Sequence, residues 1–125
     1  MSNRILNVEV RTHHLNFAEA EIWVIVTAER TTETTEVRGR FVGPKSDRSS
    51  TVEVAYRLRP FPHKPEHLPD LAVRVVIPEP SVWSAEMPLV YDGVVELWQD
   101  GERCDVRQVP GYRLLTANST SSRSP

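Results

Sequence analysis

The sequence predicts an all-β domain, and two observations support this prediction. Several short segments alternate apolar and polar residues with a period of two, which is typical of half-buried strands. No window of about ten residues has the three-and-four apolar spacing of an amphipathic helix, and β-branched residues dominate the periodic segments. The seven expected strands cover residues 5–12, 21–29, 36–42, 51–59, 71–77, 91–99 and 102–109.

Each strand is expected from the apolar residues that would face the core. The first three strands carry Leu6, Val8 and Val10; Ile22, Val24, Val26 and Ala28; and Val37 and Phe41. The fourth strand, where the alternation is clearest, carries Val52, Val54, Tyr56 and Leu58. The fifth carries Leu71, Val73, Val75 and Ile77. The last two carry Val95 and Leu97, and then Cys104 and Val106.

The segments between the strands contain turn and loop residues. Asp100 and Gly101 form the strongest hairpin signal, and residues 59–69 are a proline-rich stretch. Seven short strands at this spacing favour an immunoglobulin-like antiparallel sandwich over a closed barrel. We expect residues 1–115 to form this one domain and residues 116–125 to be a flexible polar tail.

Composition narrows the functional classes. The 125 residues suffice for one core, and a net charge of −2 offers no basic field for nucleic acid or an anionic membrane surface. Cys104, the single cysteine, fits a reducing compartment, and no apolar run approaches the roughly 20 residues of a membrane span. We therefore expect a soluble, cytoplasmic protein.

One stretch near the C-terminus has a recognisable pattern. Between residues 80 and 113 the shared features are Pro80, Trp83, Ser84, Glu86, Pro88, Tyr91, Asp100, Gly101, Asp105, Gly111, Tyr112 and Arg113. This pattern resembles the last strands of the immunoglobulin-like sandwich domain in glycoside hydrolase family 2, the β-galactosidase and β-glucuronidase group. Ala85 and Val90 depart from it, where the family commonly has proline and leucine.

The resemblance implies a non-catalytic module. In those enzymes both catalytic glutamates lie in a barrel that follows the sandwich, and such a barrel needs about 250 residues. Here twelve residues follow Arg113. We therefore expect a stand-alone module that is not an enzyme and needs no cofactor.

Pro80 and Pro88 cannot donate ladder hydrogen bonds, so the segment between them should cross from one sheet to the other. Trp83 could cap the open end of the sandwich there, and the alternative is a ring that stacks on a ligand.

Candidate chemistry is sparse. The carboxylates Glu79, Glu86, Asp92 and Glu96 would lie on a convex face rather than across a cleft. Cys104 is expected to be buried and inert. His63 and His67 are four residues apart, but the prolines around them oppose a helix, and adjacent His13 and His14 would point to opposite faces. We expect neither a catalytic site nor a metal site.

Binding is the more open question, because Trp23, Ile25 and Trp98 fall on the polar faces of their strands. They could form a protein interface or a glycan platform, or a neighbouring segment could cover them. The first functional hypothesis is association with another protein or with a second copy. The second is carbohydrate binding, and a hydrolase acting alone ranks third.

Overall fold

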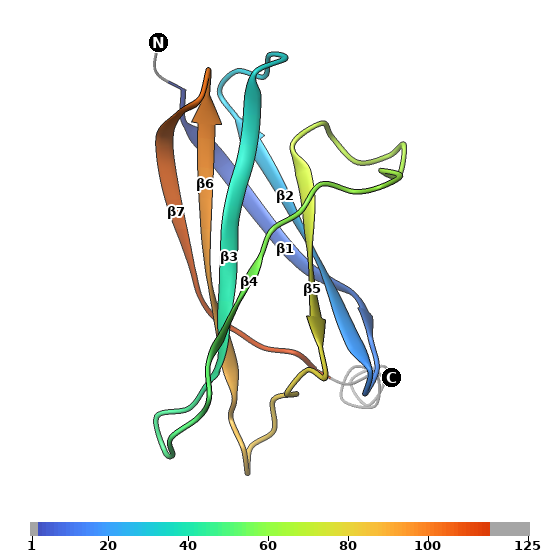
Figure 1. Cartoon of the computed structure of the whole chain (residues 1–125), viewed down its shortest axis with the longest axis vertical. Coiled ribbons are helices and arrows are strands. Elements are labelled where there is room, and N and C mark those ends of the chain that lie inside the picture. Colours follow the sequence, from blue (N-terminus) through green and yellow to red (C-terminus); the bar gives the residue numbers. More distant parts are fainter. Residues whose placement is uncertain (1–2, 116–125) are drawn as a thin grey trace, which may run out of the picture.

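The computed structural model describes residues 3–115, which form a β-sandwich (Figure 1). This confirms the all-β prediction, and the part of the chain that is described contains no helix that could cross a bilayer. The tail expected at residues 116–125 lies outside the described residues. The strands are β1 (Ile5–Leu15), β2 (Glu19–Ala28), β3 (Thr35–Lys45), β4 (Val54–Arg57), β5 (Ala72–Pro78), β6 (Val90–Gln99) and β7 (Glu102–Tyr112).

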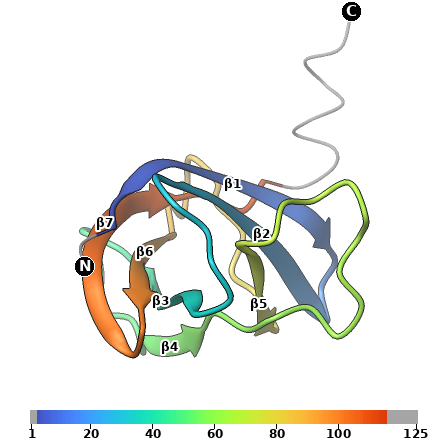
Figure 2. The ribbon, with the colours of Figure 1, turned by 90° about the horizontal axis from the view of Figure 1, so that it is seen from above.

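The strands form two antiparallel sheets that face each other. One sheet has the order β1-β2-β5 and the other the order β4-β3-β6-β7. Figure 2 shows the two layers from above. The Asp100–Gly101 hairpin joins β6 to β7 as predicted, and both residues have positive φ angles, as tight hairpin turns require.

The core lies between the inner faces and contains most of the predicted apolar positions. In β2 and β5 the predicted inward residues do pack in the core, although Trp23, Ile25 and Ala72 on the outer face are buried as well. Phe41, Val95, Leu97 and Tyr91 contribute from the four-stranded sheet. These side chains form one continuous cluster, so the two sheets share a single core.

Two edge strands differ from the prediction. Residues 51–53 lie outside β4, and Val52 is 86% exposed, while Val54 is also exposed. β4 is an edge strand that pairs with β3 over only four residues, so its beginning has no inner sheet to pack on. In β1, Leu6 is exposed because the pairing with β2 is irregular between Ile5 and Asn7.

The inward positions predicted for Cys104 and Val106 are wrong. Trp98 pairs with Arg103 and Leu97 with Asp105, so Cys104 is the extra residue of a bulge. The bulge reverses the alternation of β7, and Val106 becomes exposed while Cys104 is half-buried.

The reversal in β7 places polar side chains where they join the two sheets. An Asp105 carboxylate oxygen accepts the Ile5 N–H at 2.8 Å, and the Arg107 guanidinium donates to the Ile5 carbonyl at 2.9 Å. The Thr12 and Tyr112 hydroxyls are 2.8 Å apart farther along the same seam. Side chains therefore connect β1 to β7 where no backbone ladder does.

Residues 79–89 cross from β5 to β6, as predicted from Pro80 and Pro88. The backbone N–H of Ser81 donates to the Tyr91 hydroxyl at 3.0 Å, and that of Trp83 to the Leu114 carbonyl at 2.8 Å. The Trp83 ring is half-buried under the Arg113 guanidinium, whose carbon lies 4.5 Å from the ring centroid. Trp83 thus packs on the C-terminal end of the domain rather than within the core cluster.

Candidate functional site

Trp23 and Ile25 do lie on the outer face of β2, but the chain itself covers them. Trp23 is 7% exposed and Ile25 8% exposed. They form a second apolar cluster with Leu68 and Ala72, against which Phe61 packs. The proline-rich segment 59–69 supplies this cover. Of the three alternatives for Trp23 and Ile25, the structure supports cover by a neighbouring segment, and the assignment of these two residues to a binding surface does not hold, because they are buried.

Ring contacts fix Trp23 in place. The His13 ring stacks on it at 3.9 Å between centroids, and the Phe61 ring meets it edge-on at 5.5 Å. Its indole N–H donates to a Glu21 carboxylate oxygen at 2.9 Å. His67, which the sequence paired with His63, lies 6.2 Å from the same indole ring. Within residues 3–115 no group of three metal-ligating side chains occurs.

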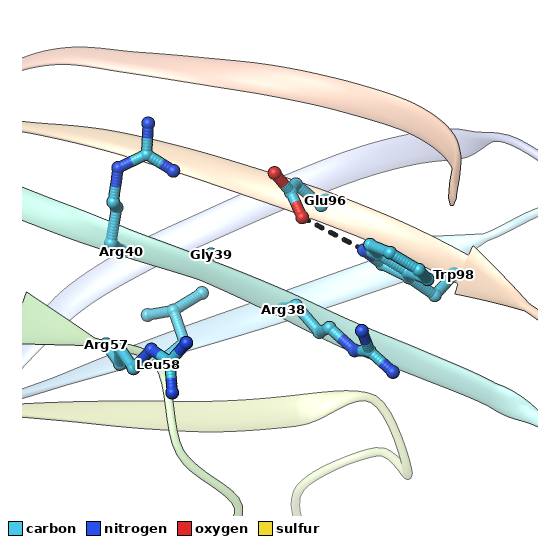
Figure 3. Close-up of a pocket in the computed structure, with 7 residues that line it drawn as sticks. All are labelled: Arg38, Gly39, Arg40, Arg57, Leu58, Glu96 and Trp98. Atoms are coloured by element: carbon cyan, nitrogen blue, oxygen red, sulfur yellow. Dashed lines mark hydrogen bonds between the residues drawn. The ribbon is translucent and has the colours of Figure 1, made fainter. Parts of the chain in front are cut away.

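Trp98 occupies a different environment, at a groove on the outer face of the four-stranded sheet (Figure 3). The groove has a volume of about 500 Å³. The groove lies where the chain leaves β4. The backbone N–H of Leu58 still donates to the Gly39 carbonyl of β3, whereas the next residue, Arg59, pairs with Arg74 of β5 in the other sheet. Its lining residues are Arg38, Gly39, Arg40, Arg57, Leu58, Glu96 and Trp98.

The Trp98 side of the groove is held by polar contacts. The indole N–H donates to a Glu96 oxygen at 2.9 Å, and Arg103 approaches the other Glu96 oxygen at 3.6 Å. The Arg38 guanidinium carbon lies 3.9 Å from the Trp98 ring centroid, a cation–π contact. Arg38 also donates to Glu36 at 2.8 Å, and this hydrogen bond raises the pKa of Arg38.

The other side of the groove carries two arginines. Arg40 on β3 and Arg57 on β4 are directly paired in the ladder, so their side chains leave the same face of the sheet. Both are exposed, and no carboxylate of the described chain lies within ion-pair distance of either. In Figure 3, Arg40 extends toward β6, while Arg57 lies with Leu58 on the far side of Gly39.

Sequence reasoning found Trp98 but missed the arginines around it. Arg38 and Arg40 alternate with the inward positions of β3, and Arg57 lies between Tyr56 and Leu58. The alternation alone therefore places these arginines on the outer faces of β3 and β4. The pairing of β3 with β4 and with β6 brings these residues together, and the sequence does not reveal that pairing.

The remaining residues of the recognised pattern have structural contacts. Tyr91 is fully buried and receives the Ser81 N–H, while the Gly111 N–H donates to an Asp92 oxygen at 2.8 Å. Asp92 also lies 3.2 Å from the Lys45 ammonium. The Gly111 hydrogen bond, aided by Lys45, lowers the pKa of Asp92. Asp92, considered above as a catalytic candidate, thus holds the end of β7 against β6.

The model for the family described as glycosyl hydrolases family 2 matches residues 3–111, which is most of the chain. The chain belongs to this family. No curated protein is similar enough in sequence to match the family 2 domain.

Solved enzymes share the fold of this family 2 domain. A β-glycosidase from Bacteroides vulgatus aligns with 91% of the chain at 18% identity and a TM-score of 0.57. A β-glucuronidase from glycoside hydrolase family 2 aligns with 90% of the chain at 13% identity and a TM-score of 0.52. The β-glucuronidase of Bifidobacterium dentium, in complex with coumarin-3-O-glucuronide, aligns with 86% of the chain at 15% identity and a TM-score of 0.53. The chain spans only 14%, 13% and 18% of these three enzymes, respectively.

Several exposed apolar side chains belong to segments at one end of the family 2 domain. Phe17 in the β1–β2 turn is 93% exposed, and Met87 in the β5–β6 crossover is 54% exposed. Val52 in the β3–β4 loop and Leu115 after β7 are exposed as well. The turn, loop and crossover lie at the lower end in Figure 1, where β7 also ends. The opposite end carries the Asp100–Gly101 hairpin.

Proposed function

We propose that this family 2 domain is a non-catalytic accessory module that acts by packing against another protein surface. The observation that carries the proposal is the apolar end formed by Phe17, Val52, Met87 and Leu115. Exposed apolar residues in four segments that meet at one end of a small domain favour an association surface there. The simplest partner is a second copy of the chain, because an apolar end complements itself.

The contacts in the groove support the non-catalytic part of this proposal. Glycoside hydrolysis uses two carboxyl groups facing each other about 5 to 10 Å apart. Glu96 is the carboxylate that lines the groove, and it is engaged by the Trp98 indole and by Arg103. The other charged groups lining the groove are guanidinium groups, which neither donate a proton to a leaving group nor attack a sugar at neutral pH.

Two measurements test this function. Light scattering at rising protein concentration should show dimers for the natural chain and monomers for Phe17→Ser combined with Met87→Ser. Leu6→Ser, a matched change at an exposed site on β1 away from this end, should still dimerise. The purified chain should not hydrolyse chromogenic β-glycosides. A natural chain that stays monomeric near millimolar concentration would overturn self-association, and turnover lost in Glu96→Gln would overturn the non-catalytic role.

A cytoplasmic location is part of the same proposal. Its support is the single thiol of Cys104, which has no second cysteine in the sequence with which to form an internal disulfide. Fractionation of the source cells tests it, and recovery of the chain from an extracellular or periplasmic fraction would contradict it.

Carbohydrate binding at the groove is a second candidate function, favoured by Trp98. An aromatic ring beside hydrogen-bonding groups, in a hollow of about 500 Å³, fits a small polar ligand. The structural relatives include a β-glycosidase and two β-glucuronidases, which act on sugars. Calorimetric titration with neutral and charged disaccharides tests this function, and absence of heat at millimolar ligand for every sugar would reject it.

A further inference from the structure

We propose that the groove at Trp98 takes an anionic carbohydrate, a sugar that carries a carboxylate or a sulfate group. This inference rests on the second candidate function and names its ligand class. The groove lining contains three guanidinium groups, those of Arg38, Arg40 and Arg57, against the single carboxylate of Glu96. Outside the lining, Arg103 pairs with Glu96 and Glu36 pairs with Arg38, so the uncompensated positive charge is that of Arg40 and Arg57. The groove is thus positively charged, although the whole chain carries a net charge of −2.

The cross-strand pair of Arg40 and Arg57 is the central observation. Like charges directly opposite each other in a ladder destabilise a sheet, and an opposite charge on one of the two strands would relieve the repulsion. Here both positions carry arginine, and no carboxylate of residues 3–115 pairs with either. The fold therefore places two arginines without a carboxylate partner at paired positions of adjoining strands, and a bound anion would supply the counter-charge that they lack.

The chemistry of guanidinium selects the kind of anion. An arginine side chain presents a planar set of N–H donors that matches a carboxylate or a sulfate with two parallel hydrogen bonds. Arg40 and Arg57 are exposed and not held by carboxylates, so they are free to turn toward such a group. Arg38 is already engaged by Glu36 and by the Trp98 ring, so Arg40 and Arg57 are the arginines available to a ligand.

The rest of the lining favours a sugar over an acidic peptide. Glu96 offers oxygen acceptors for hydroxyl groups, and Trp98 and Leu58 offer apolar surface for the carbon face of a ring. A volume of about 500 Å³ is the size of a small-molecule site, whereas a protein partner buries about 800 Å² on each side of an interface. The large exposed apolar residues Phe17 and Met87 lie at the end of the domain and not in the groove lining.

The test is calorimetric titration of the full chain at low salt with matched sugars. The probes are cellobiose against its uronic acid counterpart, galactose against galactose 6-sulfate, and oligoglutamate as an acidic peptide. We expect one or both anionic sugars to bind at least about tenfold more tightly than the neutral ones, equivalent to about 1.4 kcal/mol. Binding should weaken as salt rises, because the contacts are charged and exposed. The carboxylate and sulfate arms distinguish the two sources of negative charge.

Variants locate the site. Arg40→Gln and Arg57→Gln should each weaken binding of the anionic sugar about tenfold while leaving the chain as stable as before or slightly more stable, because each removes the like-charge pair. Arg11→Gln is the matched control, an exposed arginine on β1 of the other sheet that pairs with Glu9. It should leave sugar binding unchanged.

The outcomes separate this inference from the function on which it rests. Equal binding of neutral and anionic sugars would overturn the inference and leave carbohydrate binding intact. Absence of binding to any sugar would overturn both. Tighter binding of oligoglutamate with the same sensitivity to Arg40 and Arg57 would replace the sugar by an acidic peptide. Anionic sugar binding that survives Arg40→Gln and Arg57→Gln would place the site elsewhere and overturn the assignment.

Discussion

Asp92 shows how one side chain holds the end of a strand. One of its carboxylate oxygens accepts the backbone N–H of Gly111 at 2.8 Å, and the other lies 3.2 Å from the Lys45 ammonium. These contacts favour the charged form, and the hydrogen bond from Gly111 is the main reason that the pKa of Asp92 is lowered. The contacts thereby link the stability of this end of the sandwich to pH.

Asp92→Asn tests that link. Because the pKa of Asp92 is lower in the folded chain than in the unfolded chain, the ionised carboxylate stabilises the fold at neutral pH. This stabilisation is lost as the pH falls below about 4 and through the folded-state pKa. Because the carboxylate is partly exposed, we expect Asp92→Asn to lower the free energy of unfolding by less than about 1 kcal/mol at pH 7 and by a smaller amount at pH 3. Urea unfolding at both pH values measures it.

A matched control for Asp92→Asn is Asp47→Asn in the exposed β3–β4 loop, which should change stability little at either pH. Equal losses for Asp92→Asn at pH 7 and pH 3 would contradict the role assigned to the charge.

Gly39 is a position where only glycine fits. Its φ of +147° is rare for other residues, and an added Cβ would overlap the Val94 carbonyl oxygen of β6. We expect Gly39→Ala to lower the free energy of unfolding by at least about 2 kcal/mol. Gly101→Ala also has a positive φ, but its Cβ would meet no atom within 4 Å, so it should cost only about 1 kcal/mol. Equal costs in denaturant unfolding would exclude the overlap as the cause.

At the scale of elements, the segment 59–69 is a structural cover and not a free loop. Leu68 is buried against Trp23 and Ile25, and the Lys64 ammonium donates to the Leu68 carbonyl at 2.9 Å. Arg59 is joined to Arg74 of β5 by backbone hydrogen bonds of 2.7 and 2.9 Å. The segment therefore gives the three-stranded sheet a small second core on its outer face.

Leu68→Ala tests the cover. Removing the buried side chain should destabilise the domain by about 2 kcal/mol, because it leaves a cavity over Trp23. Thermal unfolding measures the change, and hydrogen exchange should show faster exchange in residues 59–69. Leu115→Ala, at a partly exposed site, should change stability much less. A Leu68→Ala domain as stable as the natural one would show that the loop contributes no packing.

At the scale of the whole molecule, both sheets contribute to one continuous core. Ile22, Val24 and Val75 face it from the three-stranded sheet, while Phe41 and Leu97 face it from the other. Because neither sheet buries its inner face alone, the two should unfold together.

Leu97→Ala tests this cooperativity. Leu97 is fully buried, so its truncation should lower the free energy of unfolding by about 2 to 5 kcal/mol. Far-ultraviolet circular dichroism reports the strands of both sheets, and tryptophan fluorescence reports Trp23 and Trp98, which lie on different sheets. If the sheets unfold together, both signals should change at the same new urea midpoint. Separate midpoints for the two probes would show that the sheets unfold independently.

The sequence by itself determined the fold class, the positions of the strands and the family resemblance. Alternation in β2, β5 and β6 is a local property, since each inward residue is set by a period of two. The same reasoning failed in β7, where the bulge at Cys104 shifts the faces, and in β4, whose first expected residues have no sheet to pack on.

The candidate site was decided by tertiary structure. Trp23 and Trp98 look alike in the sequence, each between polar residues on a strand. The loop at 59–69 buries the first, and strand pairing surrounds the second with Arg38, Arg40 and Arg57. Both outcomes depend on contacts between residues far apart in the chain. A period of two reports which face a side chain occupies, but only the assembled sandwich determines what covers that face.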